Sequence, residues 1–193
     1  RFGVANDGYW GMCVRQGHAY DLTFYARTAG GERFDLTVSL ETPGGSTVCA
    51  RAVVSGVTGP WARYRCSLTA ECDTRHGRLV MAVDRPGTLW LDVVSLFPRQ
   101  TFRHRPNGLR PDLAGMLEAL HPAFMRFPGG AIVGGLTLDN RIQWKHSVGD
   151  IATRTGTANL WGYYTTNGLG FHEYLQLCED LGADALWVCN PGM

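Results

Sequence analysis

The chain has 193 residues, of which 45% are hydrophobic, and its formal net charge is +1. A chain of this length forms one or two domains, and the balanced charge excludes the broad basic surface of a nucleic-acid-binding protein. No stretch approaches the ~20 consecutive apolar residues of a membrane-spanning helix. Neither nucleic acid nor a membrane is therefore an expected partner.

Residues 1–97 show the two-residue periodicity of β-strands. In the segment 20–27, Tyr20, Leu22, Phe24 and Ala26 alternate with more polar residues, and 34–41 repeats this pattern. Further strands are predicted at 47–54, 63–68, 78–83 and 88–96, separated by turn signals such as Pro43-Gly44-Gly45. Several short strands without a helix indicate an antiparallel β-sandwich, which we predict to be a jelly roll.

Residues 98–193 follow a different pattern and are predicted to form a second domain. Apolar residues at helical spacing predict a helix over 109–120, which leads into a strand at 123–127. A helix at 170–181, with Tyr174, Leu175, Cys178 and Leu181 on its buried face, leads into a strongly apolar strand at 185–189. The fold is thus predicted to be mixed, with a partial (β/α) barrel of about two parallel strands; a small open α/β layer is the alternative.

A long loop at 128–169 connects the first of these strands to its helix. Parallel strands place ligand sites just beyond their C-terminal ends. Gly129 and Gly130 follow one strand, and Asn190 follows the other. Because Trp and Asn beside flexible backbone suit the faces and hydroxyls of a sugar, we predict a sugar pocket that includes Trp161. The alternatives are a tight turn for the glycines, packing under the loop for Trp161, and a capping role for Asn190.

The remaining reactive side chains show no recognisable metal or catalytic spacing. Buried free thiols are expected for the six cysteines, which are Cys13, Cys49, Cys66, Cys72, Cys178 and Cys189. Solvated surface positions are expected for Glu173, Glu179, Asp180, His146 and His172. Asp139 is expected to order its loop or to meet Arg141 rather than to act in catalysis. No cofactor and no metal are expected.

Several motifs together resemble the α-L-arabinofuranosidases of glycoside hydrolase family 51. They are Arg105-Pro106-Asn107-Gly108-Leu109-Arg110, Arg126-Phe127-Pro128-Gly129-Gly130, Asn140-Arg141 with Trp144-Lys145, Asn159-Leu160-Trp161-Gly162-Tyr163, Thr166-Asn167-Gly168-Leu169-Gly170 and Cys178-Glu179-Asp180-Leu181-Gly182. Residues 1–97 are similar to the carbohydrate-binding-module-like jelly roll of a subgroup of that family. The resemblance implies that 98–193 begin the catalytic barrel, with 123–127 as its second strand and 185–189 as its third, and that the chain is an internal fragment.

The resemblance also implies a retaining hydrolase that releases terminal α-L-arabinofuranosyl groups from arabinan- or arabinoxylan-type polysaccharides. Its two catalytic glutamates are expected outside this chain, so the fragment alone is expected to be inactive. Trp161 resembles the tryptophan that lines the arabinose subsite, whereas Ala131 stands where the family often has Cys and Gly134 where it commonly has an acidic residue. The implied substrate-binding residues are Gly129, Gly130, Ala131, Trp161 and Asn190.

Two other functions are compatible with the sequence. The chain could be a non-catalytic carbohydrate-binding module with an α/β appendage, or its jelly roll could only brace the barrel. Exposed aromatic residues on one sheet face would favour the binding module, and the candidates are Tyr9, Trp10, Tyr25, Trp61 and Trp90. Open parallel strands expose unpaired edges, which makes a homo-oligomer compatible with the sequence as well. The sequence does not indicate a cellular compartment.

Overall fold

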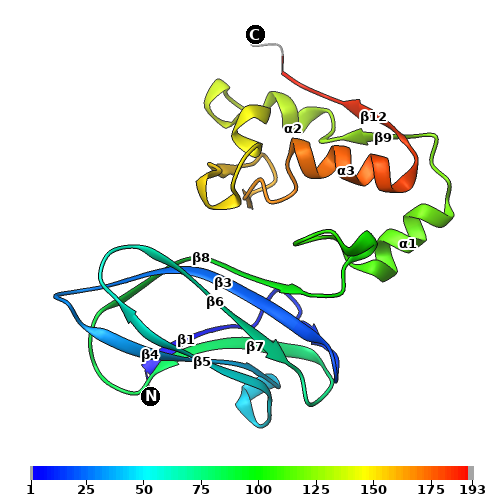
Figure 1. Ribbon diagram of the computed structural model, residues 1–193. Helices are drawn as coiled ribbons and strands as arrows, with labels where there is room; N and C mark the ends of the chain where they lie inside the picture. Colours follow the sequence, from blue (N-terminus) through cyan, green and yellow to red (C-terminus); the bar gives the residue numbers. More distant parts are fainter. Residues whose placement is uncertain (1, 191–193) are drawn as a thin grey trace. The chain divides into compact units, whose positions relative to one another are not determined.

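The computed structural model describes residues 2–190 (Figure 1). The chain divides into two compact units, which we call unit 1, ending at Pro111, and unit 2, starting at Asp112. Unit 1 is built from strands, and unit 2 combines helices with short strands. Among the described residues, no helix is long and apolar enough to cross a membrane.

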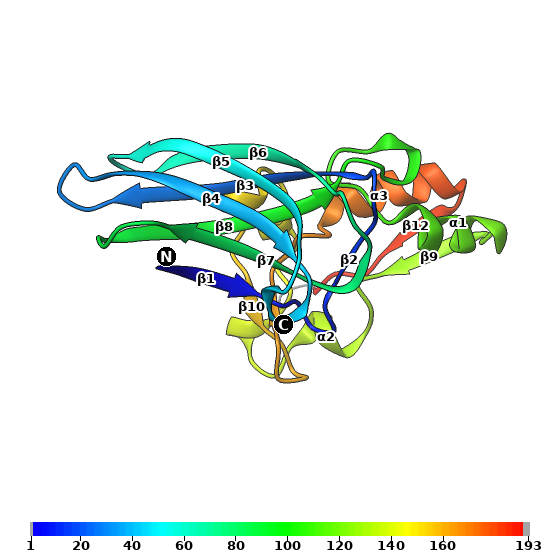
Figure 2. The same ribbon diagram turned by 90° about the horizontal axis from the view of Figure 1, so that it is seen from below.

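Unit 1 is an antiparallel β-sandwich of eight strands. They are β1 (Phe2–Asn6), β2 (Met12–Val14), β3 (Ala19–Thr28), β4 (Arg33–Glu41), β5 (Val48–Thr58), β6 (Ala62–Thr69), β7 (Thr74–Val83) and β8 (Leu89–Pro98). One sheet has the order β1-β7-β4-β5, with β2 also paired to β7, and the other has the order β6-β3-β8. Figure 1 shows the two sheets as separate layers, and Figure 2 shows β1 at the edge beside β7.

The alternating sequence pattern accounts for the core of the sandwich. Leu22, Phe24 and Ala26 of β3 are fully buried, as are Val38 and Leu40 of β4. The six predicted strands are confirmed as β3 to β8. The sequence reading missed β1 and β2, because all five residues of β1 are exposed and β2 has only three residues, so neither shows a clear alternation.

The expectation of six buried free thiols is fully met by Cys178 and not by the other five cysteines. Cys49 and Cys72 form a disulfide, although 23 positions separate them. Next to this bond, the Glu71 N–H, beyond β6, donates to the Cys49 carbonyl at 2.7 Å. Cys13 and Cys189 are free but exposed, Cys66 is half-buried, and Cys178 is free and buried as expected. Burial raises the pKa of the Cys66 thiol.

Within the described residues, unit 2 contains two adjacent parallel strands and three helices. The first helix, α1, begins at Pro111, the last residue of unit 1. Its elements are α1 (Pro111–Ala119), β9 (Phe124–Phe127), α2 (Ala131–Gly134), β10 (Thr157–Ala158), β11 (Tyr164–Thr165), α3 (Phe171–Leu181) and β12 (Asp184–Trp187). Short 3₁₀ turns lie at Phe102–His104 in unit 1 and at Leu138–Asn140, Trp144–Ser147 and Ile151–Thr153 in unit 2. β9 and β12 are parallel and directly paired, which confirms that prediction.

The two long helices agree with their predicted positions but not in every packing detail. In α3 the buried residues are Tyr174, Leu177, Cys178 and Leu181, so Leu177 takes the place predicted for Leu175. Gly182 ends α3 in the left-handed conformation, as its predicted capping role requires. The apolar residues of α1, by contrast, remain largely exposed, and only Ala114 of this helix is buried.

Candidate functional site

The C-terminal ends of β9 and β12 place several predicted site residues at one edge of the parallel pair. Phe127 is in register with Trp187, and the Val188 N–H donates to the Phe127 carbonyl at 2.8 Å. The segment Pro128-Gly129-Gly130 leaves this edge from β9, and the segment that leads to Asn190 leaves it from β12. The Phe127–Pro128 peptide bond is cis. Asn190 is half-buried and has polar contacts of its own.

The glycine turn leaves open space beside the strand end. Gly129 has φ +128°, which favours glycine, and a Cβ added there would meet only Ile132, at 3.8 Å. A Cβ on Gly130 would meet only the guanidinium of Arg126, at 3.5 Å. Ala131 is exposed and begins the short helix α2. A ligand could therefore approach the backbone of this turn closely.

Trp161 lies at the tip of the hairpin formed by β10 and β11. Its N–H donates to Asn159 Oδ1 at 2.9 Å, and Asn159 Nδ2 donates to Thr165 Oγ1 at 3.1 Å. The Trp161 ring is 56% exposed. No Trp161 atom lies within 4 Å of the position that a Cβ would occupy on Gly129 or Gly130. The place of Trp161 in a sugar pocket with these glycines therefore stays a prediction.

The sequence reading did not include Tyr163 among the site residues. Its ring stacks on that of Trp161, with centroids 6.3 Å apart and an interplanar angle of 16°. Tyr163 is 54% exposed, so the two rings form an exposed aromatic pair rather than part of a core. The signal was present in the sequence, because the two aromatic residues flank a single glycine, Gly162. In the structure this glycine has φ +81°.

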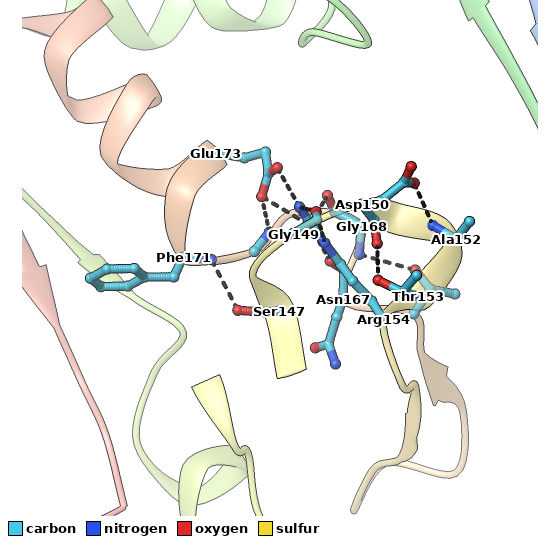
Figure 3. A network of polar contacts seen from close by, with 12 residues as sticks. Ser147, Gly149, Asp150, Ala152, Thr153, Arg154, Asn167, Gly168, Phe171 and Glu173 are labelled. Atoms are coloured by element: carbon cyan, nitrogen blue, oxygen red, sulfur yellow. Dashed lines mark hydrogen bonds and ion pairs between the residues drawn. The ribbon is translucent and has the colours of Figure 1, made fainter. Parts of the chain in front are cut away.

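Arg154 and Glu173 form an ion pair that fastens the long loop to α3 (Figure 3). The distance from Arg154 Nη2 to Glu173 Oε1 is 2.7 Å, and the Arg154 side chain is 3% exposed. The same guanidinium donates to the Gly149 carbonyl at 2.8 Å and to the Asn167 carbonyl at 2.9 Å. This set of contacts, which we call the Arg154 clamp, joins both ends of the segment that carries the hairpin.

Glu173 is therefore not the solvated surface residue that the sequence suggested. Its carboxylate also accepts a hydrogen bond from the Gly170 N–H at 2.9 Å, which caps the start of α3. Burial acts to raise the pKa of Glu173, but hydrogen bonds from Arg154 and from the backbone outweigh it and hold that pKa below its ordinary value. This ion pair could not be predicted from the sequence, because Arg154 and Glu173 are 19 positions apart.

A cluster of five aromatic rings packs beneath the strand ends and joins β9, β12, α3 and the turn at Trp144–Ser147. The five residues are Phe127, Trp144, Phe171, Tyr174 and Trp187, and neighbouring centroids lie 4.8 to 5.6 Å apart. Tyr174 is buried, and its hydroxyl donates to the Met125 carbonyl. These contacts fix the strand ends relative to α3.

The other carboxylates and histidines form no catalytic arrangement that the structure shows. Within residues 2–190, no three His, Cys, Asp or Glu side chains are grouped to hold a metal ion. His146 and His172 are exposed, as predicted. Asp139 lies in a 3₁₀ turn that Asn140 holds, because Asn140 Oδ1 accepts from the Leu136 and Thr137 N–H groups. Arg141 donates to the Leu138 carbonyl.

Comparison with known proteins relates both units to one group of enzymes. The family model described as Alpha-L-arabinofuranosidase 1 domain matches residues 116–193. An extracellular exo-alpha-L-arabinofuranosidase of Streptomyces chartreusis is 42% identical over 96% of this chain, and alpha-L-arabinofuranosidase 1 of Arabidopsis thaliana is 37% identical over 99% of it. The chain spans 23% and 28% of the length of these two relatives.

A solved structure extends the similarity to the fold. The arabinose-bound MgGH51 α-L-arabinofuranosidase is 34% identical to this chain and matches 96% of it with a TM-score of 0.89. The match covers 31% of the solved chain. The sequence resemblance and the fold therefore agree.

Proposed function

We propose, from the membership of this chain in the α-L-arabinofuranosidases of glycoside hydrolase family 51, that it forms part of a retaining hydrolase. The complete enzyme releases terminal α-L-arabinofuranosyl groups from arabinan- or arabinoxylan-type polysaccharides. The observation that carries this proposal is the fold match to an arabinofuranosidase structure over 96% of the chain at 34% identity.

The division into domains is part of the same proposal. Residues 1–97 form a jelly roll of the carbohydrate-binding type, and residues 98–193 begin a (β/α)₈ barrel. The direct parallel pairing of β9 with β12, with α3 between them in the chain, supports this assignment because barrels repeat that unit. The antiparallel sandwich of unit 1 supports the assignment of the first domain.

The residues at the strand ends and in the hairpin form one wall of the arabinofuranosyl site. Gly129, Gly130 and Ala131 present backbone to the sugar, Asn190 hydrogen-bonds a hydroxyl, and Trp161 stacks on an apolar sugar face. The open space at Gly129 and the exposure of Trp161 support these roles. We add Tyr163, because its ring extends the surface of Trp161.

The chemistry of bond cleavage requires groups outside this chain. Retaining glycosidases hold an acid and a nucleophile with carboxyl groups ~5–5.5 Å apart. Glu173 is held by Arg154 and by the start of α3. The 193-residue chain therefore binds part of the sugar but does not cleave it.

The first test compares the isolated chain with the complete enzyme on a nitrophenyl α-L-arabinofuranoside. We expect turnover by the complete enzyme and none by the chain, because without both carboxylates neither proton delivery nor a covalent route is available. Absorbance of released nitrophenol measures both rates. Turnover by the pure chain would contradict the placement of the catalytic groups, and an inactive complete enzyme would contradict the proposed function.

The second test replaces Trp161 by Ala in the complete enzyme. We expect kcat/KM to fall by about fivefold or more, since an aromatic wall contributes ~1 kcal/mol or more to sugar contact, while the melting temperature stays unchanged because Trp161 is 56% exposed. Trp10→Ala, an exposed tryptophan of unit 1, is the matched control and should change neither quantity. A lower melting temperature with normal kinetics would show that Trp161 packs the loop instead.

A further inference from the structure

The outward face of the β6-β3-β8 sheet carries an arginine between two tryptophans. Leu22, Phe24 and Ala26 of β3 point into the core, so Tyr25 and Arg27 point outward. The guanidinium carbon of Arg27 lies 4.2 Å from the ring centroid of Trp90 and 5.3 Å from that of Trp61. Trp90 pairs with Arg27 from β8, and Trp61 directly precedes β6 on the other side of β3. We call this group the Trp-Arg-Trp platform.

The arginine of the platform keeps its hydrogen-bonding capacity unused. Its Nε is buried and has no hydrogen-bond partner in the described part of the chain. Cation–π contacts with the two rings satisfy the charge without using any N–H donor. Because Nε is buried, a carboxylate that approaches from solvent would meet the two terminal Nη groups of Arg27, which can donate two parallel hydrogen bonds to it.

The surroundings of the platform add positive charge and accessible aromatic surface. Trp61 is 45% exposed and Trp90 is 38% exposed. On the same face, Tyr25 of β3 is paired with Arg63 of β6 and with Asp92 of β8. Two residues along β3, Thr23 is paired with Arg65 of β6. Arg63, Arg65 and Asp92 are exposed, and the same face carries Asp21, which pairs with Arg99. Counting Arg27, four arginines therefore outnumber two carboxylates on this face.

We propose that this face binds a polysaccharide that carries uronic acid groups. The tryptophan rings provide stacking surfaces for sugar residues, and Arg27 and Arg63 receive the carboxylates. A neutral glycan would leave the unused donors of Arg27 without their best acceptor, and a non-sugar polyanion would leave the rings unused. This binding site lies wholly in unit 1 and is independent of the activity proposed for the complete enzyme.

Affinity electrophoresis of the 193-residue chain tests the proposal, with polygalacturonate in the gel as the acidic glycan. We expect polygalacturonate to retard the chain, and expect Arg27→Gln, Arg63→Ser and Trp90→Ala each to weaken binding at least fivefold. Arg51→Ser, an exposed arginine of β5 in the other sheet, is the matched control and should bind as the unchanged chain does. Circular dichroism checks that each variant is folded, and Arg63→Ser decides the outcome if the platform variants do not fold.

Two further gels separate the contributions of sugar and charge. Neutral linear arabinan and polyglutamate should each retard the chain at least tenfold less than polygalacturonate. Equal retardation by polyglutamate, or an equal loss in Arg51→Ser, would reduce the effect to general charge attraction and overturn the proposal. Failure of polygalacturonate to retard the chain would overturn it as well. In the complete enzyme, Arg63→Ser should leave turnover of a nitrophenyl arabinofuranoside unchanged, so this result is separable from the proposed activity.

Discussion

Replacing Arg154 by Met is expected to destabilise unit 2 by about 3 kcal/mol, because removal of one partner of a buried ion pair leaves the other charge without compensation. The Arg154 side chain is 3% exposed and the Glu173 side chain is 28% exposed. We therefore expect a loss at the lower end of the ~3–5 kcal/mol that breaking a buried ion pair costs. The substitution also frees the carbonyls of Gly149 and Asn167. Chemical denaturation followed by tryptophan fluorescence measures the change.

Arg99→Met is the matched control for this prediction. Arg99 pairs with Asp21 at 2.6 Å, but the side chains are 58% and 46% exposed. Exposed pairs contribute ~0–1 kcal/mol, so the control should change stability little. An equal loss in both variants would show that the burial of Arg154 is unimportant.

The same ion pair predicts a dependence of unit 2 on pH. The folded-state pKa of Glu173 lies below its ordinary value of 4.5, so its stabilisation is complete above about that pH and is lost as the pH falls through the lower folded value. Thermal unfolding between neutral and strongly acidic pH should show this loss in the unchanged chain. Glu173→Gln should reduce the slope, because the substituted residue does not titrate. An unchanged slope would assign the acid sensitivity to other carboxylates.

Removing the Cys49–Cys72 disulfide is expected to destabilise unit 1 by about 3 kcal/mol, the value for a disulfide that closes a loop of this length. The bond links residues that are 23 positions apart and so restricts the unfolded chain. Urea denaturation of the double variant Cys49→Ala with Cys72→Ala measures the effect, and a reducing agent should reproduce it in the unchanged chain.

Cys13→Ala is the control for the disulfide, because Cys13 is free and exposed. Its unfolding midpoint should match that of the unchanged chain. If reduction leaves the midpoint of the unchanged chain where it was, the disulfide does not contribute to stability in the way proposed.

Local patterns in the sequence were sufficient to predict β3 to β9, β12 and the two long helices, but not β1, β2, β10, β11 or α2. The alternation in β3 follows from the two-residue repeat of a strand with one buried face, and the glycine at 182 marks the end of α3. The choice of Leu175 over Leu177 in α3 was wrong because both lie close to the helical stripe, and only packing against neighbouring elements distinguishes them.

Contacts between distant residues were not predictable in this way. The Cys49–Cys72 bond, the Arg154–Glu173 pair and the position of Arg27 between Trp61 and Trp90 depend on how strands and loops meet in space. The place of the two glycines just beyond a strand end, in contrast, could be predicted from sequence, because an apolar strand segment directly precedes them. The positions of Gly129 and Gly130 after β9 illustrate this.

The exposed apolar residues of unit 2 have a consequence for handling the isolated chain. The exposed residues are Leu113 and Met116 of α1, Leu120 just after it, Phe124 of β9 and Leu186 of β12. Within residues 2–190, β9 and β12 pair only with each other, so each offers a free strand edge. Free edges beside apolar side chains promote aggregation. Concentrated samples of the chain should therefore scatter more light per unit mass of protein than dilute ones, and dilute samples are the appropriate choice for the binding and unfolding measurements.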